Sequence, residues 1–217
     1  MDLSVVIPLY NESESIEELN KWITNTLNSS SISFEIIYID DGSLDGSWDK
    51  IKRLANNSNN IKGISFSKNF GKSQALNAGF IESKGNFVAT LDADLQDSPE
   101  EIPEMINKIK KGNLDLISGW KKKRYDSLVF KKIPSKLFNF VARYTSGIKI
   151  HDFNCGIKVY RSYVIKSIDV YGDMHRFIPI IAMNKGYNKI DEHIVKHQAR
   201  KFGKTKFGNE RFMRGFL

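Results

Sequence analysis

Residues 1–118 alternate short β-branched, apolar runs with longer amphipathic segments. This is the pattern of repeated strand–helix units, which build a mostly parallel sheet flanked by helices. The sequence predicts strands over 3–8, 34–39, 61–66, 86–91 and 114–118, and helices over 13–28, 45–57, 72–84 and 99–111. Strands 34–39 and 86–91 are nearly all apolar, as expected where both faces of a strand are covered. The predicted fold class is therefore α/β, and the 217 residues suit one domain.

Polar clusters follow three of the predicted strands. The segment 8–12 (Pro-Leu-Tyr-Asn-Glu) comes after the first strand, 40–43 (Asp-Asp-Gly-Ser) after the second and 92–94 (Asp-Ala-Asp) after the fourth. Each cluster alone is compatible with simple turn chemistry. Because ligands of open α/β sheets bind outside the carboxyl ends of the strands, their shared position favours one binding crevice.

Asp92 and Asp94 end a buried strand, and the side-chain amide of Gln96 follows two residues later. Oxygen atoms of this kind are the ligands that Mg²⁺ and Mn²⁺ prefer. The motif thus indicates metal-assisted handling of a diphosphate. The alternative is that the two aspartates cap the helix that starts near Pro99.

The net charge of +8 is unevenly distributed. Residues 1–120 hold 11 basic and 18 acidic residues, whereas 121–217 hold 22 basic and 7 acidic ones. The basic half should meet an anionic partner, and nucleic acid, an anionic bilayer and phosphorylated substrates all qualify. Because Cys155 is the only cysteine and Met1 leads directly into an apolar strand, we expect a reducing, cytosolic setting. No apolar run has the length that a spanning helix requires.

The regular alternation stops at Trp120. Pro134 is predicted to open a helix that ends at Gly147, with apolar residues at helical spacing and lysines and arginine on the remaining surface. Such a basic amphipathic helix either packs on the domain core or lies on a membrane. We further expect a loop that enters a short strand at 152–158, a helix near 174–186 and a strand near 188–195. None of the four histidines has metal-ligand spacing to another His or Cys, so they are read as core or surface residues.

Seven segments carry a resemblance that spans almost the whole chain in order. They are 6–12 (VIPLYNE), 39–43 (IDDGS), 69–72 (NFGK), 91–97 (LDADLQD), 118–121 (SGWK), 152–156 (DFNCG) and 200–206 (RKFGKTK). The chain resembles the family 2 glycosyltransferases of GT-A (Rossmann-like) fold, in particular the polyprenyl-phosphate hexosyltransferases that are similar to dolichyl-phosphate mannose synthase.

The resemblance implies a site for a nucleotide-sugar donor in residues 1–120. Its metal would be Mg²⁺ or Mn²⁺, bound by Asp94 and Gln96. Arg200 and Lys206 would lie on a segment that closes over the diphosphate. The residues implied to hold the nucleoside, ribose and diphosphate are Pro8, Tyr10, Glu12, Ile39, Asp41, Asp92, Ala93 and Asp94.

The resemblance also implies an acceptor site in residues 121–217, where Lys121 and Lys132 would bind the acceptor phosphate with Ser135 as an added donor. Lys131 or Lys136 could equally be the second cation. The alternative for this basic cluster is adhesion to anionic lipid. Asp152 is implied to lie near the reaction centre, either as a base for a hydroxyl acceptor or in orienting a cation or capping a turn. A phosphate acceptor needs no base, because it is already anionic at neutral pH.

We therefore expect an inverting hexosyltransferase that moves sugar from a UDP- or GDP-linked donor to polyprenyl (undecaprenyl or dolichyl) phosphate at the cytosolic membrane face. Its product would serve cell-envelope glycan or glycoconjugate synthesis. A family 2 enzyme with a hydroxyl saccharide acceptor is the alternative. A nucleic-acid-binding module is less consistent with the sequence, which lacks a recognisable motif for one. Enzymes of the lipid-phosphate type often continue into transmembrane helices, so we expect either a membrane anchor or peripheral association through 133–144.

Overall fold

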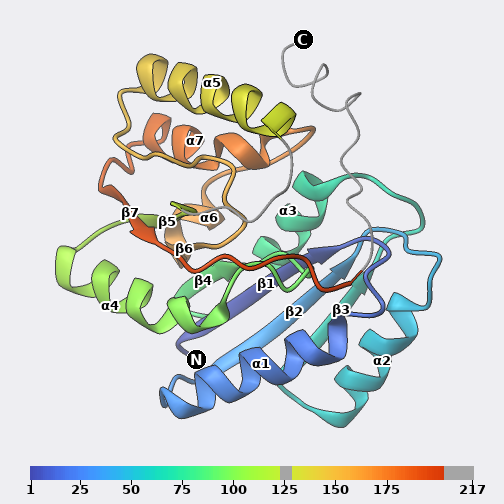
Figure 1. Ribbon diagram of the computed structural model, residues 1–217. Coiled ribbons are helices and arrows are strands. Elements are labelled where there is room, and N and C mark those ends of the chain that lie inside the picture. The colour runs from blue at the N-terminus through green and yellow to red at the C-terminus, as the bar shows by residue number, and fades with distance from the viewer. Residues whose placement is uncertain (123–128, 203–217) are drawn as a thin grey trace.

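Residues 1–122 and 129–202 are described by the computed structural model, which gives only the backbone for 129–137. Within these described residues, seven strands form one sheet in the order β3-β2-β1-β4-β6-β5-β7 (Figure 1). The strands are β1 (Leu3–Leu9), β2 (Phe34–Asp40), β3 (Ile61–Ser65), β4 (Phe87–Thr90), β5 (Leu116–Trp120), β6 (Lys158–Arg161) and β7 (Ile190–Ile194). All neighbouring strands are parallel except β6, which runs antiparallel to both β4 and β5. The predicted mostly parallel α/β sheet is confirmed.

Helices cover both faces of this sheet. The helices and 3₁₀ turns are α1 (Ile16–Ser29), α2 (Ser47–Asn57), α3 (Lys72–Glu82), η1 (Pro99–Glu101), α4 (Ile102–Gly112), α5 (Val129–Ser146), α6 (Ser162–Lys166), η2 (Met174–Phe177) and α7 (Ile178–Asn184). Successive side chains of a strand point to opposite faces. Val5 and Ile7 of β1 accordingly pack with α1 and α4, while Val6 packs with α3 and α7. This two-sided cover explains why every residue of β1 and β2 is buried.

The strand β6 ties the second half of the chain into the first. It lies between β4 and β5, so that Val159 stands opposite Ala89 on one side and Ile117 on the other. The sequence predicts this strand but not its place or direction. The insertion separates β5 from β4, although β5 follows β4 along the chain.

The helix α5 begins earlier than predicted. It starts at Val129, so the prediction that Pro134 opens the helix was wrong. A proline removes one backbone hydrogen bond, which can bend or weaken a helix but does not forbid helical residues before it. The helix ends at Ser146, just before Gly147, whose φ of +72° stops the helix as predicted.

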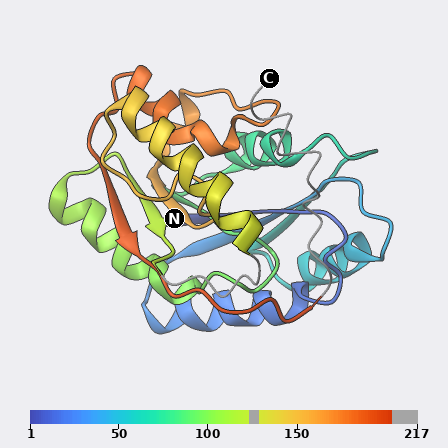
Figure 2. The same cartoon turned by 45° about the horizontal axis from the view of Figure 1, so that its top comes forward.

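The helix α5 lies over α7 on the outside of the molecule (Figures 1 and 2). Its described part packs Phe138 and Ala142 against the domain, in a cluster with Phe153. The opposite side presents Phe140 and Tyr144, whose rings stack 6.3 Å apart and are 59% and 82% exposed. Packing on the domain core and contact with a membrane, the two interpretations of this amphipathic helix, are therefore both compatible with the structure. One side of the helix packs on the core, and the other side is exposed. Within the described part of the chain, no helix combines the length and apolar character needed to cross a bilayer.

Candidate functional site

A cleft of about 240 Å³ opens at the carboxyl ends of β1, β2 and β4. The three polar clusters that follow these strands meet there, as expected for an open α/β sheet. Asn69 from the loop before α3, Lys72 at the start of α3 and Arg200 from the far end of the chain also line the cleft. The cleft is lined by polar residues and by residues that the sequence predicted for the donor site. They are Pro8, Tyr10, Glu12, Asp41, Asn69, Lys72, Asp92, Ala93, Asp94 and Arg200.

Asp41 holds the loop before α3 against the cleft. One carboxylate oxygen accepts a hydrogen bond from the backbone N–H of Phe70 at 2.7 Å, and the other accepts one from the N–H of Gly71 at 2.9 Å. Gly71 has a φ of +97°, which a residue with a side chain rarely adopts. Two charge-assisted hydrogen bonds thus fix the backbone between Asn69 and Lys72, both of which face the cleft.

Asp92 forms an ion pair and a hydrogen bond with Lys72 of α3. Burial by itself would raise the pKa of Asp92, but the charge of Lys72 and this hydrogen bond outweigh it and lower the pKa to about 2. Gly156 lies directly over the carboxylate, because a Cβ atom at that position would come within 2.7 Å of the Asp92 carboxyl carbon. Asp92 is therefore a fixed anion, enclosed by α3 on one side and by the loop before β6 on the other.

Asp94 has the opposite electrostatic character. Burial and the neighbouring charge of Asp92 raise its pKa to about 6, against the opposing charge of Arg200. The Arg200 guanidinium donates to Asp94 Oδ2 at 2.6 Å and to Glu12 Oε1 at 3.2 Å. A carboxylate whose charge is this poorly neutralised is suited to a divalent cation, which would supply more positive charge than one guanidinium.

The turn after Asp94 is held by a strained residue. Asp94 Oδ1 accepts a hydrogen bond from the backbone N–H of Gln96 at 3.1 Å, while Leu95 between them has a φ of +61°. A branched aliphatic residue in the left-handed region costs on the order of 1 kcal/mol, and burial of the Leu95 side chain offsets that cost. The turn brings the backbone of Gln96 close behind Asp94, and the metal-binding role of the two side chains stays a prediction.

The segment after β7 runs alongside this turn and positions Arg200. The N–H of Gln198 donates to the Gln96 carbonyl at 2.9 Å, and its side-chain amide donates to the Leu95 carbonyl at 2.6 Å. An antiparallel bridge joins Asp97 and His197. These contacts explain how a residue so late in the chain reaches the carboxylates that follow β4.

The end of β5 is joined to the same turn by a buried ion pair. The Lys121 ammonium lies 2.8 Å from Asp97 Oδ1, and the two side chains are 13% and 1% exposed. Burial would lower the pKa of Lys121, but the charge of Asp97 outweighs it and raises the pKa above its usual value. An ammonium has three N–H donors, so one of them can hold Asp97 while others remain for a ligand.

Asp152 is buried and caps a turn. Its Oδ1 accepts a hydrogen bond from the N–H of Asn154 at 3.1 Å, and its carbonyl accepts one from the Ser118 hydroxyl at 3.1 Å. Asp152 is not among the residues that line the cleft. The geometry agrees with the turn-capping role, one of the two that the sequence left open.

The remaining predicted residues have different surroundings. Ile39 is fully buried on β2 and packs in the core with α3, below the cleft and not along its wall. Lys132 and Ser135 lie on α5, where only the backbone is described. Lys206 lies outside the described residues.

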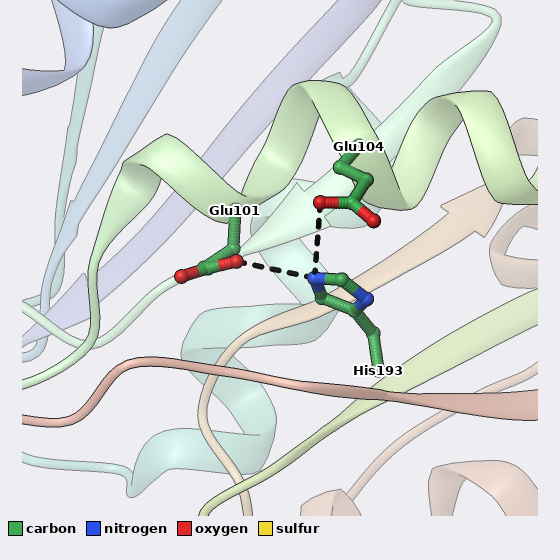
Figure 3. Close-up of side chains that lie close together, drawn as sticks. All are labelled: Glu101, Glu104 and His193. Carbon is green, nitrogen blue, oxygen red and sulfur yellow. Dashed lines mark hydrogen bonds and ion pairs between the residues drawn. The ribbon is translucent and has the colours of Figure 1, made fainter.

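A second group of carboxylates with a histidine occurs at the far side of the sheet. Glu101 and Glu104 lie beside His193 of β7 in an arrangement that could hold a metal ion (Figure 3). However, Lys108 Nζ lies 2.7 Å from His193 Nδ1, and a lysine ammonium can only donate. His193 Nε2 therefore carries the ring proton and donates to Glu101 at 3.1 Å. Both ring nitrogens of His193 thus have partners in this structure, and these contacts join β7 to α4 and to the 3₁₀ turn η1 before it.

Sequence reasoning missed the cationic residues around Asp92. Lys72 belongs to a polar segment that precedes a predicted helix, so a search for polar clusters beside every strand would have found it. Lys158, His175 and Arg176 lie 66, 83 and 84 residues beyond Asp92 in the sequence and carry no spacing signal. Only the antiparallel insertion of β6 and the packing of η2 against α3 bring them to the site.

The fold and the paired carboxylates after β4 define the chain as a protein of the GT-A class. The structure superposes with a TM-score of 0.72 on a crystal structure of Mycobacterium tuberculosis glucosyl-3-phosphoglycerate synthase, at 17% identity, over 97% of this chain and 75% of that one. It also superposes on Staphylococcus aureus TarS in complex with UDP-GlcNAc, with a TM-score of 0.66 and 20% identity, over 99% and 64% of the two chains. The predicted fold is thereby confirmed.

The sequence comparison gives the family. The model described as Glycosyl transferase family 2 matches residues 4–169, and the chain belongs to this family. It is 35% identical to the dodecaprenyl-phosphate galacturonate synthase of Rhizobium johnstonii, over 100% of this chain and 65% of that protein. It is 38% identical to the undecaprenyl-phosphate 4-deoxy-4-formamido-L-arabinose transferase of Salmonella choleraesuis, over 98% and 63% of the two chains. The chain thus spans slightly less than two thirds of the length of these relatives.

Proposed function

We propose that this protein transfers a sugar from a nucleoside-diphosphate donor to a polyprenyl phosphate for synthesis of a cell-envelope glycan or glycoconjugate. Membership of family 2 and the names of the two relatives support a sugar transferase with a polyprenyl-phosphate acceptor. The single observation that carries the proposal is the cleft in which Asp92 and Asp94 face the cations Lys72 and Arg200. Such a site suits a ligand that brings both a diphosphate and a divalent cation.

In this proposal the donor lies in the half formed by residues 1–120. Tyr10, Glu12 and Asp41 border the nucleoside, with the backbone near Pro8 and Ile39 beneath it. Asp92 and Ala93 face the ribose and diphosphate. Arg200 leaves Asp94 and, with Lys206, binds the diphosphate.

The metal would be held by Asp94 and Gln96, whose oxygens are the hard ligands that Mg²⁺ and Mn²⁺ prefer. When bound, it would stabilise the negative charge that develops on the leaving nucleoside diphosphate. A structure of the mycobacterial synthase contains Mn²⁺ together with UDP. The choice between the two metals is part of the test below.

The acceptor phosphate would lie in the half formed by residues 121–217, bound by Lys121, Lys132 and Ser135. It attacks the anomeric carbon in one in-line displacement that inverts the configuration, and its own charge makes a protein base unnecessary. Asp152 then keeps the turn at Asn154 in shape and removes no proton. We place this reaction at the cytosolic membrane face, with the exposed side of α5 toward an anionic lipid surface.

The test uses the purified chain, Mn²⁺ or Mg²⁺ and radiolabelled UDP- or GDP-sugars with a short polyprenyl phosphate. Label that moves into organic solvent, only when metal and lipid phosphate are both present, is the expected result. Label that stays aqueous on an added oligosaccharide would instead identify the hydroxyl-acceptor alternative. If neither UDP nor GDP raises the melting temperature in a metal-dependent way, the donor-site assignment fails.

A further inference from the structure

A second, smaller cavity adjoins the cleft on the far side of Asp92. It has a volume of about 20 Å³ and shares Pro8, Lys72 and Asp92 with the cleft. Three further basic residues line the cavity: Lys158 from β6, and His175 and Arg176 from η2. Asp92 is the one carboxylate of this lining, and Lys72 already neutralises it. The cavity therefore has an excess of positive charge.

Two of these cations have no ionic partner in the part of the chain that the structure describes. Among residues 1–122 and 129–202, Arg176 forms no ion pair, although it lines the cavity. Lys158 is only 4% exposed, and its ammonium donates to the Cys155 carbonyl, with no carboxylate at ion-pair distance in the described part of the chain. Burial lowers the pKa of Lys158, although the acidic groups of Cys155 and Asp152 oppose this shift. A buried lysine of this kind is stabilised by an anion that binds beside it.

The third group, His175, is held as a hydrogen-bond donor. Ser73 Oγ accepts a hydrogen bond from the backbone N–H of His175 at 3.0 Å and lies 3.1 Å from its Nδ1. Ser73 is fully buried, so its hydroxyl proton is satisfied by donation to Nδ1. Burial and the charges of Lys72 and Arg176 keep the pKa of His175 well below its usual value, so the ring is neutral. The ring proton then sits on Nε2, which has no partner among the described residues.

We propose that Lys158, His175 and Arg176 form a second anion-binding subsite, which receives an oxyanion other than the donor diphosphate. The inference rests on the proposed function, because it concerns a charged group on one of the two substrates of the same site. The cavity holds about one water-sized group, so a single terminal oxygen enters it from the cleft. Two substrate groups have this chemistry: a carboxylate on the donor sugar and the phosphate monoester of the acceptor. Arg176 and Nε2 of His175 donate to that oxygen, and Lys158 supports it from below.

The experiment measures binding to the full chain with Mn²⁺ by calorimetry, in two arms. The donor arm compares UDP-galacturonate with UDP-galactose, and UDP-glucuronate with UDP-glucose, which differ only in the carboxylate; GDP-mannuronate and GDP-mannose replace them if GDP is the nucleotide that binds. The acceptor arm compares farnesyl phosphate with farnesol. Both arms are repeated with Arg176→Gln, His175→Leu and His175→Gln. The matched control is Arg53→Gln, because Arg53 is an exposed arginine on α2 whose ion pair among the described residues is with Glu17.

Loss of one charge-assisted hydrogen bond predicts about tenfold weaker binding in one arm for Arg176→Gln and His175→Leu. His175→Gln keeps an N–H donor and should retain most of the affinity. Weaker binding of only the uronate donors assigns the subsite to the sugar, and weaker binding of only farnesyl phosphate assigns it to the acceptor. Unchanged affinity in both arms overturns the proposal, as does equal weakening of UDP itself, which would place Arg176 at the diphosphate. Absence of any nucleotide binding by the unaltered chain would instead refute the donor site, and the farnesyl phosphate arm would still test the subsite.

Discussion

Asp92 and Asp94 show how two identical residues acquire different roles from their partners. Both are largely enclosed, yet the pKa of Asp92 falls to about 2 and that of Asp94 rises to about 6. Lys72 donates directly to Asp92, whereas Asp94 lies beside the charge of Asp92 and shares Arg200 with Glu12. The first carboxylate is therefore permanently charged, and the second is the one whose charge an added cation would stabilise most.

The substitution Asp94→Asn should separate binding from stability. Above pH 6 the ionised carboxylate of Asp94 disfavours the folded state, because its pKa in the fold lies above the usual 3.8. The variant should therefore melt at an unchanged or higher temperature at pH 7. Its affinity for UDP or GDP should lose its dependence on Mn²⁺, with a loss of about tenfold or more. Calorimetry and thermal melts check both outcomes, with Asp49→Asn on the surface of α2 as the control; a Mn²⁺ response like that of the unaltered chain would contradict the metal assignment.

The substitution Asp92→Asn should have a pH-dependent effect on stability. The folded pKa of about 2 lies below the usual 3.8, so the charged carboxylate stabilises the fold above pH 4. This contribution is lost as the pH falls from about 4 to 2. Because the Asp92 side chain is 32% exposed, we expect on the order of 1 kcal/mol. Urea unfolding of the variant and of the unaltered chain at pH 7 and at pH 2.5 measures this contribution. A difference in their free energies of unfolding that grows toward low pH would contradict the ion pair.

At the scale of elements, the contacts between segments that are distant in the sequence are what shape the site. The segment after β7 lies along the turn that follows β4, and Lys121 at the end of β5 reaches Asp97 in the same turn. Three elements thus meet at residues 94–97. The local patterns predicted each of these elements but did not predict that they meet.

Lys121→Met tests how much this junction depends on the buried ion pair. Removing one partner leaves the other charge buried without compensation, which typically costs about 3–5 kcal/mol. We expect a loss of this size in the free energy of unfolding, measured with urea. The neighbouring Lys122 is exposed, and its ammonium lies over the ring of Trp120, so Lys122→Met should cost less than about 1 kcal/mol. The double variant of Lys121→Met with Asp97→Asn should recover part of the loss; additive losses would contradict a direct pair.

The exposed side of α5 gives a prediction about membranes. Phe140 and Tyr144 form a stacked aromatic pair on the helix face that does not pack on the domain. Replacing both with serine should lower partitioning onto anionic vesicles by about tenfold or more in a sedimentation assay. Ile81 and Tyr171 are similarly exposed on other elements, so the pair Ile81→Ser and Tyr171→Ser is the matched control. Equal partitioning of the two double variants would remove α5 as the contact surface.

The sequence was informative wherever a pattern is local. Short apolar runs predicted β1 to β4 within a residue or so, and three of these strands, β1, β2 and β4, are buried on both faces. The start of α5 was wrong because a proline signals a helix boundary only statistically. The antiparallel direction of β6 was not predictable, since Lys158–Arg161 is a short strand that depends on pairing with β4 and β5.

At the scale of the whole molecule, the sequence predicted the site residues that follow local patterns but not those that depend on the arrangement of the strands. The sequence placed Pro8, Glu12, Asp41 and Asp94 together because each lies at or just after the carboxyl end of a strand of a parallel sheet, and the structure gathers them in one cleft. It could not place Arg176 or Lys158, because their proximity to Asp92 arises from the order of strands in the sheet. Arg200, Lys158 and Arg176 of the basic second half therefore lie beside the carboxylates of the acidic first half, around the cleft and the smaller cavity next to it.

The position of β6 between β4 and β5 also sets an order of events during synthesis. When Leu116–Trp120 leaves the ribosome, β5 has no strand beside it, and one edge of β4 is bare until Lys158–Arg161 emerges. Unpaired strand edges invite association with other chains. We therefore expect a chain that stops at Ile148 to aggregate and to be cut rapidly by a protease that the 217-residue chain resists. Equal protease resistance would mean that the first four strands fold as an independent unit.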